Sequence, residues 1–348
     1  MLSRRTFVAG AIGVGAGAAF ARQPGVPMTP VLPQRQPDRP TGGASPATFF
    51  EWKPIAPAAR VAIGSGGNSL VVRGEGAGLL IDCKNAPYAE TLRREATDFA
   101  GPLAGVINTH HHADHTGGNH AFTADIETIA HEKCTPRVLG QLNRYISQLK
   151  EVATQLEGRT GPAADRLREE AKALYLRAND LKAAQFAPRT GVGDRHTRTI
   201  AGVTVELEHF GPGHTDNDLV VRLPALNIVH TGDLLFYRSH PFIDRASGAG
   251  VRSWIGVIGK IAERCDDATV VVPGHGEVTN KAGLLSQREY FETLIAHVER
   301  LIAQGRSRKE IGESDPGAFA EYANARFRPM ALQAIYDELQ PEPAAPPK

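Results

Sequence analysis

The stretch Thr109-His110-His111-His112-Ala113-Asp114-His115 places five side chains that can bind a metal ion within six consecutive residues. It directly follows an apolar run, residues 103–108, that predicts a buried strand. On extended chain, residues two apart project to the same side, so His110 and His112 are expected to bind one ion together. Asp114 and His115 would turn toward a second position as the next helix begins.

Three later segments each supply one further ligand. His214 lies in the turn Gly211–Asp218, and His275 lies in a similar turn after a predicted strand over 268–272. Asp233 is expected just past the end of a predicted strand over 227–231. Because loops at the carboxyl ends of neighbouring strands meet at one sheet edge, these side chains are expected to converge. Imidazoles and carboxylates suit Zn²⁺, with Fe or Mn as less favoured alternatives.

This order of ligands resembles the metallo-β-lactamase-fold superfamily, whose signature HxHxDH is followed by a His, an Asp and a final His. The resemblance covers roughly residues 60–304. It implies an α/β fold, the αβ/βα four-layer sandwich, with an inserted helical hairpin and a two-metal site at one edge. It also implies the division of ligands: His110, His112 and His214 for the first metal, Asp114, His115 and His275 for the second, and Asp233 between them.

The bridging Asp233 bears on the type of enzyme. β-Lactamases of this fold commonly have Cys or Ser at the corresponding position of the ligand series, whereas an Asp resembles the glyoxalase II type and the lactonases. The segment Phe236–Arg245 follows closely and is expected to line the pocket. Tyr237 and His240 are therefore candidate substrate-binding residues, although a surface-loop position for His240 is the competing interpretation.

The predicted function is metal-dependent hydrolysis of a carbonyl-type bond in a small molecule: an ester, a thioester, a lactone or a β-lactam. A hydroxide shared by two Zn²⁺ ions would attack the carbonyl carbon, and Asp114 would act as the catalytic residue that holds it. One alternative is a persulfide dioxygenase with a single iron. A second alternative is a non-catalytic metal-binding protein.

Composition excludes some classes of partner. The chain has 348 residues, and its 39 Lys and Arg nearly balance 38 Asp and Glu, which gives a formal charge of +1. This balance argues against a nucleic-acid binder with a broad basic surface. The 3 cysteines are an odd number and form no CxxC pair, so buried free thiols are favoured over a disulfide framework, although one bridge is possible. The oligomeric state is left open.

The first residues predict export. Arg4 and Arg5 precede the apolar run Phe7–Phe20, and Ala19-Phe20-Ala21 has the form of a signal-peptidase site, so residues 1–21 resemble a twin-arginine signal peptide. The apolar run is too short to span a bilayer as a helix, which takes about 20 residues. We therefore expect a periplasmic or otherwise exported protein with no permanent membrane span and the twin-arginine translocase as its partner during export. A short uncleaved anchor is the alternative.

The remaining chain divides into three predicted parts. Residues 22–57 hold nine prolines and are expected to form an extended arm, with Phe49, Phe50 and Trp52 attaching it to the body. Residues 58–340 form the domain, with a helical insertion at about 136–185 and terminal helices over 281–304 and 318–338. Residues 341–348 are expected to be a loose tail. The insertion is expected to be packed on the body, with a substrate lid or a dimer contact as the alternatives.

Overall fold

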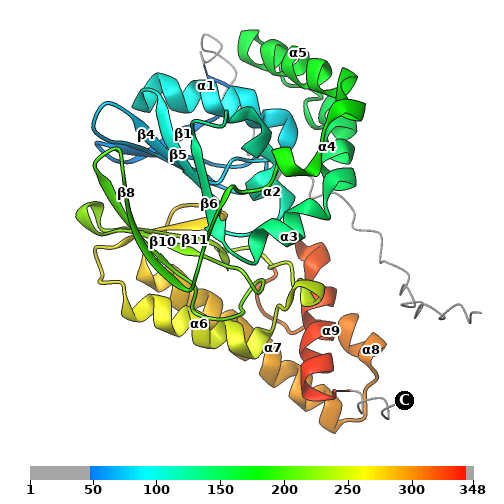
Figure 1. The fold of residues 1–348 in the computed structure, drawn as a ribbon. Coiled ribbons are helices and arrows are strands. Elements are labelled where there is room, and N and C mark those ends of the chain that lie inside the picture. The colour runs from blue at the N-terminus through cyan, green and yellow to red at the C-terminus, as the bar shows by residue number, and fades with distance from the viewer. Residues whose placement is uncertain (1–47, 342–348) are drawn as a thin grey trace, which may run out of the picture. The chain divides into compact units, whose positions relative to one another are not determined.

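The computed structural model describes residues 48–341, all of which belong to one compact unit, Leu32–Lys348. The predicted signal peptide, most of the predicted arm and the predicted tail lie outside the described residues. The described chain forms two β-sheets that face each other, with helices on the outer face of each (Figure 1).

The first sheet has seven strands in chain order, β1 to β7. Neighbouring strands are antiparallel from β1 to β4 and parallel from β4 to β7, where helical segments connect consecutive strands. The strands are β1 (Trp52–Ala56), β2 (Ala59–Ala62), β3 (Ser69–Arg73), β4 (Gly78–Ile81), β5 (Leu103–Ile107), β6 (Glu127–His131) and β7 (Thr190–Val192).

The second sheet has five strands in the order β12-β11-β10-β9-β8. It is antiparallel except for the pair β11 and β12, which is parallel because the chain returns through a helix between them. The strands are β8 (Arg195–Ile200), β9 (Val203–Glu208), β10 (Val220–Leu223), β11 (Ile228–Phe236) and β12 (Val270–His275).

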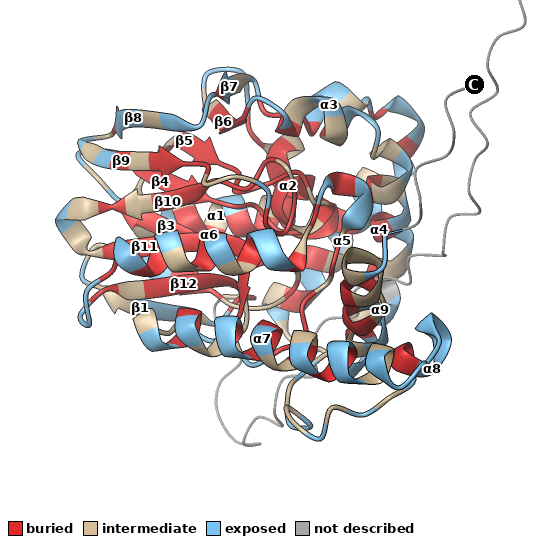
Figure 2. Ribbon diagram, turned by 90° about the horizontal axis from the view of Figure 1, so that it is seen from below, coloured by how far each residue is buried: buried red, intermediate tan, exposed pale blue. Residues whose placement is uncertain are grey.

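Three hydrophobic layers hold this arrangement together. Buried aliphatic side chains of both sheets, such as Ile81 and Val221, fill the space between the sheets. Helix α1 (Ala89–Ala100) packs on β3, β4 and β5 of the first sheet. Helices α6 (Val251–Glu263) and α7 (Lys281–Ala303) pack on the second sheet, and they show buried inner and exposed outer faces in Figure 2. The predicted four-layer αβ/βα fold is therefore confirmed.

The insertion is helical, as predicted, but its first helix is divided. The pattern predicts one helix over 137–157, whereas the structure has α3 (Cys134–Leu139) and α4 (Leu142–Gln155), separated at Gly140-Gln141. Helix α5 (Pro162–Leu176) returns beside α4 and contacts α1. Because Tyr145, Leu149 and Leu167 are buried, the hairpin is packed on the domain.

Two predicted boundaries are wrong. The domain begins before residue 58, since β1 already pairs with β2 from Trp52; Pro54 fits there because β1 is an edge strand. The predicted terminal helix over 318–338 begins only at Arg328 as α9 (Arg328–Leu339), with Pro329 in its first turn, the helical position that proline tolerates. A short helix, α8 (Arg308–Gly312), was not predicted.

The predicted attachment of the N-terminal segment has a specific partner. Phe49 and Phe50 are buried, and the Glu95 carboxylate of α1 accepts hydrogen bonds from their backbone N–H groups at 2.5 and 3.2 Å. Trp52 Nε1 donates to the same carboxylate at 2.9 Å.

No helix among residues 48–341 is long and apolar enough to cross a membrane. Cys83, Cys134 and Cys265 are buried and free, as favoured.

Candidate metal centre

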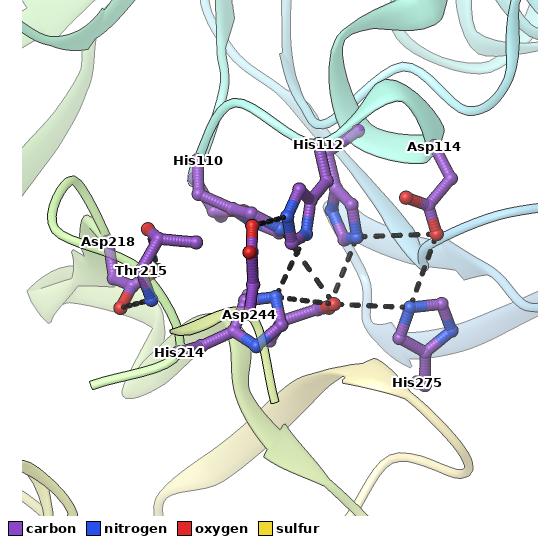
Figure 3. A network of polar contacts seen from close by, with 12 residues as sticks. His110, His112, Asp114, His214, Thr215, Asp218, Asp244 and His275 are labelled. Carbon is purple, nitrogen blue, oxygen red and sulfur yellow. Dashed lines mark hydrogen bonds and ion pairs between the residues drawn. The ribbon is translucent and has the colours of Figure 1, made fainter. Parts of the chain in front are cut away.

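The seven predicted ligands meet at one edge of the two sheets (Figure 3). The donor atoms of the first group lie within 4.8 Å of one another, and so do those of the second group. The first group is His110, His112, His214 and Asp233, and the second is Asp114, His115 and His275.

The first ligands follow β5 directly. The chain leaves β5 at Ile107, and the Asp82 carboxylate accepts hydrogen bonds from the Thr109 backbone N–H and hydroxyl, both at 2.8 Å. His112 then begins the short helix α2 (Ala113–Thr116). Behind this turn the backbone approaches closely: a Cβ on Gly118 would lie 2.1 Å from the Cys83 carbonyl oxygen. Only glycine fits there, so the sequence Gly117-Gly118 positions the ligand loop.

Asp233 lies within a strand, which corrects the prediction that it follows one. Strand β11 runs to Phe236, and its pairing with β12 is irregular on both sides of Gly232. Gly232 has φ +54°, and a Cβ there would lie 2.5 Å from Thr109 Oγ1. The irregularity gives the strand a local change of direction at the residue before Asp233.

The first donor group presents imidazole nitrogens to a common point. His112 Nδ1 and His214 Nε2 are 2.9 Å apart, and Asp233 Oδ2 is 3.4 Å from His214 Nε2. Burial lowers the pKa of His214 to about 3 and holds the pKa of His110 well below its usual value. These imidazoles are therefore neutral at pH 7, which leaves lone pairs for a cation.

The second donor group is rich in carboxylates. His115 Nε2 lies 3.1 Å from Asp233 Oδ1, while His275 Nε2 lies 3.3 Å from Asp114 Oδ2 and 3.4 Å from Asp233 Oδ2. Burial opposes the charged form of His275, but the Asp233 and Asp114 carboxylates outweigh it and raise its pKa to about 9. Protons on these histidines compensate the two acids, which is the role that a bound cation would take.

Buried donor atoms without a hydrogen bond show that this set of side chains fits metal ions. His110 Nε2, His115 Nε2 and Asp233 Oδ1 are buried and make no hydrogen bond. Unpaired buried polar atoms are rare because each costs about 1–3 kcal/mol. Three of them in one place are explained by cations between them: His110 Nε2 and Asp233 Oδ1 offer lone pairs, and a cation would take the place of the proton on His115. Neutral imidazoles and carboxylates without thiolate are also the ligands of catalytic zinc sites.

Two further carboxylates orient the histidines, and sequence reasoning missed both. Asp82 Oδ2 lies 2.7 Å from His115 Nδ1, and Asp244 Oδ2 lies 2.9 Å from His112 Nε2. Each bonds the ring nitrogen opposite the one in the donor group, an arrangement typical of metal-binding histidines. Asp244 lies in the segment expected to line the pocket, and Asp82 lies within a strand predicted over 78–83, but neither has a spacing that singles it out.

His111 belongs to neither donor group, as its alternation with His110 and His112 predicts, and its donor atom instead lies within 4.8 Å of those of His112 and Asp244. Its backbone N–H donates to Asn217 Oδ1 at 3.0 Å, and its Nδ1 is 2.9 Å from Asn217 Nδ2. Asn217 belongs to the turn that carries His214, so this pair connects the two ligand loops. In the same turn, Asp218 accepts from the backbone N–H and hydroxyl of Thr215 at 2.8 and 2.6 Å.

The two candidate substrate residues contact other parts of the structure. His240 is buried, its Nδ1 is 2.8 Å from the Tyr290 hydroxyl, and its ring packs on Tyr322. Tyr237 packs against the core beneath the second sheet, and its backbone N–H donates to the His275 carbonyl oxygen at 2.9 Å. The structure therefore does not bring the His240 ring to the donor groups, and it uses the Tyr237 backbone to hold the His275 loop.

The centre opens to solvent on one side. The side chains of His112, Asp114 and His275 are 12–16% exposed, whereas those of His110, His115, His214 and Asp233 are at most 4% exposed. Solvent therefore reaches the centre at His112, Asp114 and His275.

Comparison with known proteins agrees with this geometry. The family model of the metallo-beta-lactamase superfamily matches residues 62–275, more than half of the chain. A metallo-beta-lactamase type 2 of Bacteroides fragilis is 32% identical over 90 residues, which are 26% of this chain and 36% of that protein. An uncharacterised protein of Mycobacterium tuberculosis is 41% identical over 85 residues, 23% of this chain and 37% of that protein. The matches thus span only about a third of these relatives' length.

Solved structures share the fold. The DIM-1 metallo-beta-lactamase has a TM-score of 0.50 at 20% identity, and the match covers 70% of this chain and 97% of that one. The sec-alkylsulfatase Pisa1 from Pseudomonas sp. has a TM-score of 0.58 at 17% identity, covering 83% of this chain and 50% of that one. At these identities the likeness concerns the fold alone.

Proposed function

The chain belongs to the metallo-β-lactamase superfamily of hydrolases, and we propose that it hydrolyses a small-molecule carbonyl compound with two zinc ions. The observation that carries the proposal is the convergence of five histidines and two aspartates in two donor groups that share Asp233. Zinc ions held there would supply Lewis-acid chemistry: they would lower the pKa of a bound water toward 7 and polarise the carbonyl oxygen.

The protein's own residues then have distinct tasks. The rings of His110, His112 and His214 would hold the first position, with His110 and His214 kept neutral by burial, and Asp233 reaches both groups. The Asp114 carboxylate lies 3.3 Å from His275 Nε2, and at 16% exposure it also reaches the solvent side. It is therefore placed to accept a hydrogen bond from the attacking water and to take up its proton.

The substrate class follows from family and ligands together. We propose an ester, a thioester, a lactone or a β-lactam; the bridging Asp233 favours the first three over a β-lactam. The resemblance of residues 1–21 to a twin-arginine signal supports a further proposal, that the enzyme acts after export to the periplasm.

Hydrolysis of an ester, thioester, lactone and lactam panel tests the proposal. Activity should disappear on chelation, return with Zn²⁺, and be lost in His112→Ala. His196→Ala is the matched control, because His196 lies on β8 outside both donor groups, and it should keep full activity. Full turnover by metal-free protein would overturn the proposal. Stoichiometric iron together with oxygen uptake on a persulfide would instead identify an oxygenase.

A further inference from the structure

Another cluster of side chains that could hold a metal ion lies where the two sheets are joined. It consists of His131, Asp194 and His209, whose donor atoms all lie within 4.8 Å of one another. None of the three belongs to the donor groups of the catalytic centre. His131 ends β6 of the first sheet, His209 follows β9 of the second, and Asp194 lies in the turn between β7 and β8 where the chain passes from one sheet to the other.

The two imidazoles are buried and face each other. His131 is 1% exposed and His209 is 9% exposed, and their ring centroids are 4.5 Å apart. Contact between two buried imidazoles stabilises them little by itself. It becomes favourable when a proton or a cation lies between the two rings, or between a ring and its carboxylate partner. Burial lowers the pKa of His209, which keeps that ring neutral and able to bind a cation.

The tautomer of His209 is fixed by its surroundings. Its Nδ1 lies 2.9 Å from the Asp218 backbone carbonyl oxygen, which can only accept, so Nδ1 carries the hydrogen. Nε2 is then left with its lone pair, on the side of His131 and Asp194. A backbone carbonyl that orients a histidine in this way is the usual outer partner of a metal ligand.

The other two side chains of the cluster are His131 and Asp194. His131 Nε2 lies 3.2 Å from Asp194 Oδ1, and the Asp194 side chain is 75% exposed, so an ion can enter from solvent. If His131 binds a metal ion through Nε2, its hydrogen must lie on Nδ1. Nδ1 then no longer accepts the long hydrogen bond of 3.3 Å from the Lys133 backbone N–H. The backbone N–H of His209 donates to the Asp194 carbonyl oxygen at 2.8 Å, which keeps the turn beside the rings.

We propose that His131, Asp194 and His209 form a separate binding site for a divalent transition-metal ion of the Zn²⁺ class, with water completing the coordination. An ion there connects the first sheet, the second sheet and the turn between them. Two imidazoles and one carboxylate suit zinc, and also nickel, cobalt or copper. Binding should be weaker than at the catalytic centre, because there are only three protein ligands, one lies on an exposed turn, and the Lys133 ammonium is nearby.

The contacts of His209 connect this site to the catalytic one. The same Asp218 whose carbonyl oxygen accepts from His209 uses its carboxylate to hold Thr215, the residue after His214. An ion on His209 would therefore stabilise the base of the His214 turn without contributing a ligand to it.

Equilibrium dialysis of the full chain against buffered Zn²⁺ tests the site. Wild type should bind a third equivalent beyond the two of the catalytic centre. Asp194→Asn, which keeps the size of an exposed side chain but removes its charge, should bind that equivalent at least about tenfold more weakly. Asp267→Asn, an exposed aspartate elsewhere, is the matched control and should bind as wild type does. Hydrolase activity with the catalytic centre loaded should be unchanged in both variants.

A second variant and a direct image separate this proposal from the catalytic one. His209→Asn should lose the same equivalent as Asp194→Asn, and a zinc-soaked crystal should give an anomalous peak between His131 and His209. The difference in bound zinc between wild type and Asp194→Asn is expected whether or not the catalytic centre binds its metal ions. The proposal would be overturned if wild type bound no more zinc than Asp194→Asn. It would also be overturned by an anomalous map with no peak among His131, Asp194 and His209.

Discussion

The histidines of the catalytic centre depend on carboxylates that are not themselves ligands. Asp244 bonds His112 on the nitrogen opposite the donor group, and Asp82 does the same for His115. Such partners fix the ring orientation and make the ligating nitrogen more basic. At the scale of single residues, the centre thus includes at least two acids that the ligand motif does not contain.

Asp244→Asn should weaken metal binding by the first donor group. The amide keeps the size of the side chain and an acceptor oxygen for the Ser247 backbone N–H, but it removes the charge that supports His112. We expect the dissociation constant of that ion to rise by about 10–100-fold. Competition with a chelator of known affinity measures it, with Asp267→Asn as the control. An unchanged constant would show that Asp244 does not support His112.

His240 should contribute to stability and not to substrate binding. Burial lowers its pKa to about 4 from a usual 6.5, so the unfolded chain takes up a proton first as the pH falls. The contribution of His240 to the free energy of unfolding is therefore complete above about pH 6.5 and is lost as the pH falls toward 4. Denaturant unfolding at pH 7.5 and 5 should show a loss of about 1 kcal/mol, discounted for solvent screening, that is absent in His240→Gln. A raised KM with unchanged stability in this variant would restore the substrate role.

Single elements bring the ligands to their places, and β11 does so through an irregularity. Gly232 takes a positive φ of +54° beside the Thr109 side chain, immediately before Asp233. The loop that follows β5 and strand β11 approach each other closely at this point, where a Cβ on Gly232 would lie 2.5 Å from Thr109 Oγ1. The geometry of one glycine thus determines how the shared carboxylate meets the histidines that follow β5.

Gly232→Ala should lower both stability and metal content. The new methyl group would meet Thr109 and would also have to adopt the left-handed conformation, which together cost about 1–3 kcal/mol. Gly256→Ala is the matched control: Gly256 lies in α6, a Cβ there contacts nothing, and the change should stabilise by about 0.5–1 kcal/mol. Equal unfolding free energies and metal contents for both variants would contradict this account of β11.

The sequence predicts elements whose pattern is local and misses features that depend on packing. Apolar runs and spacing predict a strand over 69–73 and a helix over 251–264, and the structure has β3 (Ser69–Arg73) and α6 (Val251–Glu263) there. The predicted strand over 227–231 ends too early, because Gly232 looks like a stop when its tight approach to Thr109 is unknown. Asp82, Asp244 and the cluster at His131 depend on long-range contacts that no spacing encodes.

At the scale of the whole molecule, the two sheets contribute different ligands to one centre. The segment after β5 of the first sheet supplies four, and the second sheet with its turns supplies His214, Asp233 and His275. Metal ions between them would therefore couple the two halves of the sandwich. Without a cation, the carboxylates must be compensated by protons on His115 and His275.

Removal of metal should therefore destabilise the entire fold. A ligand that binds only the native state stabilises it in proportion to the logarithm of its concentration over its dissociation constant, about 4 kcal/mol at a thousandfold excess. Thermal unfolding with Zn²⁺ and with a chelator should differ by several degrees or more. His112→Ala should show a smaller difference than wild type. Superimposed curves with and without chelator would contradict the coupling.

The most direct test is an anomalous diffraction map, at the zinc edge, of protein purified without chelator. Two peaks should lie at this centre, one among His110, His112 and His214 and the other among Asp114, His115 and His275, with Asp233 between them. A map with these seven side chains ordered and no metal peak among them would contradict the proposed dinuclear centre.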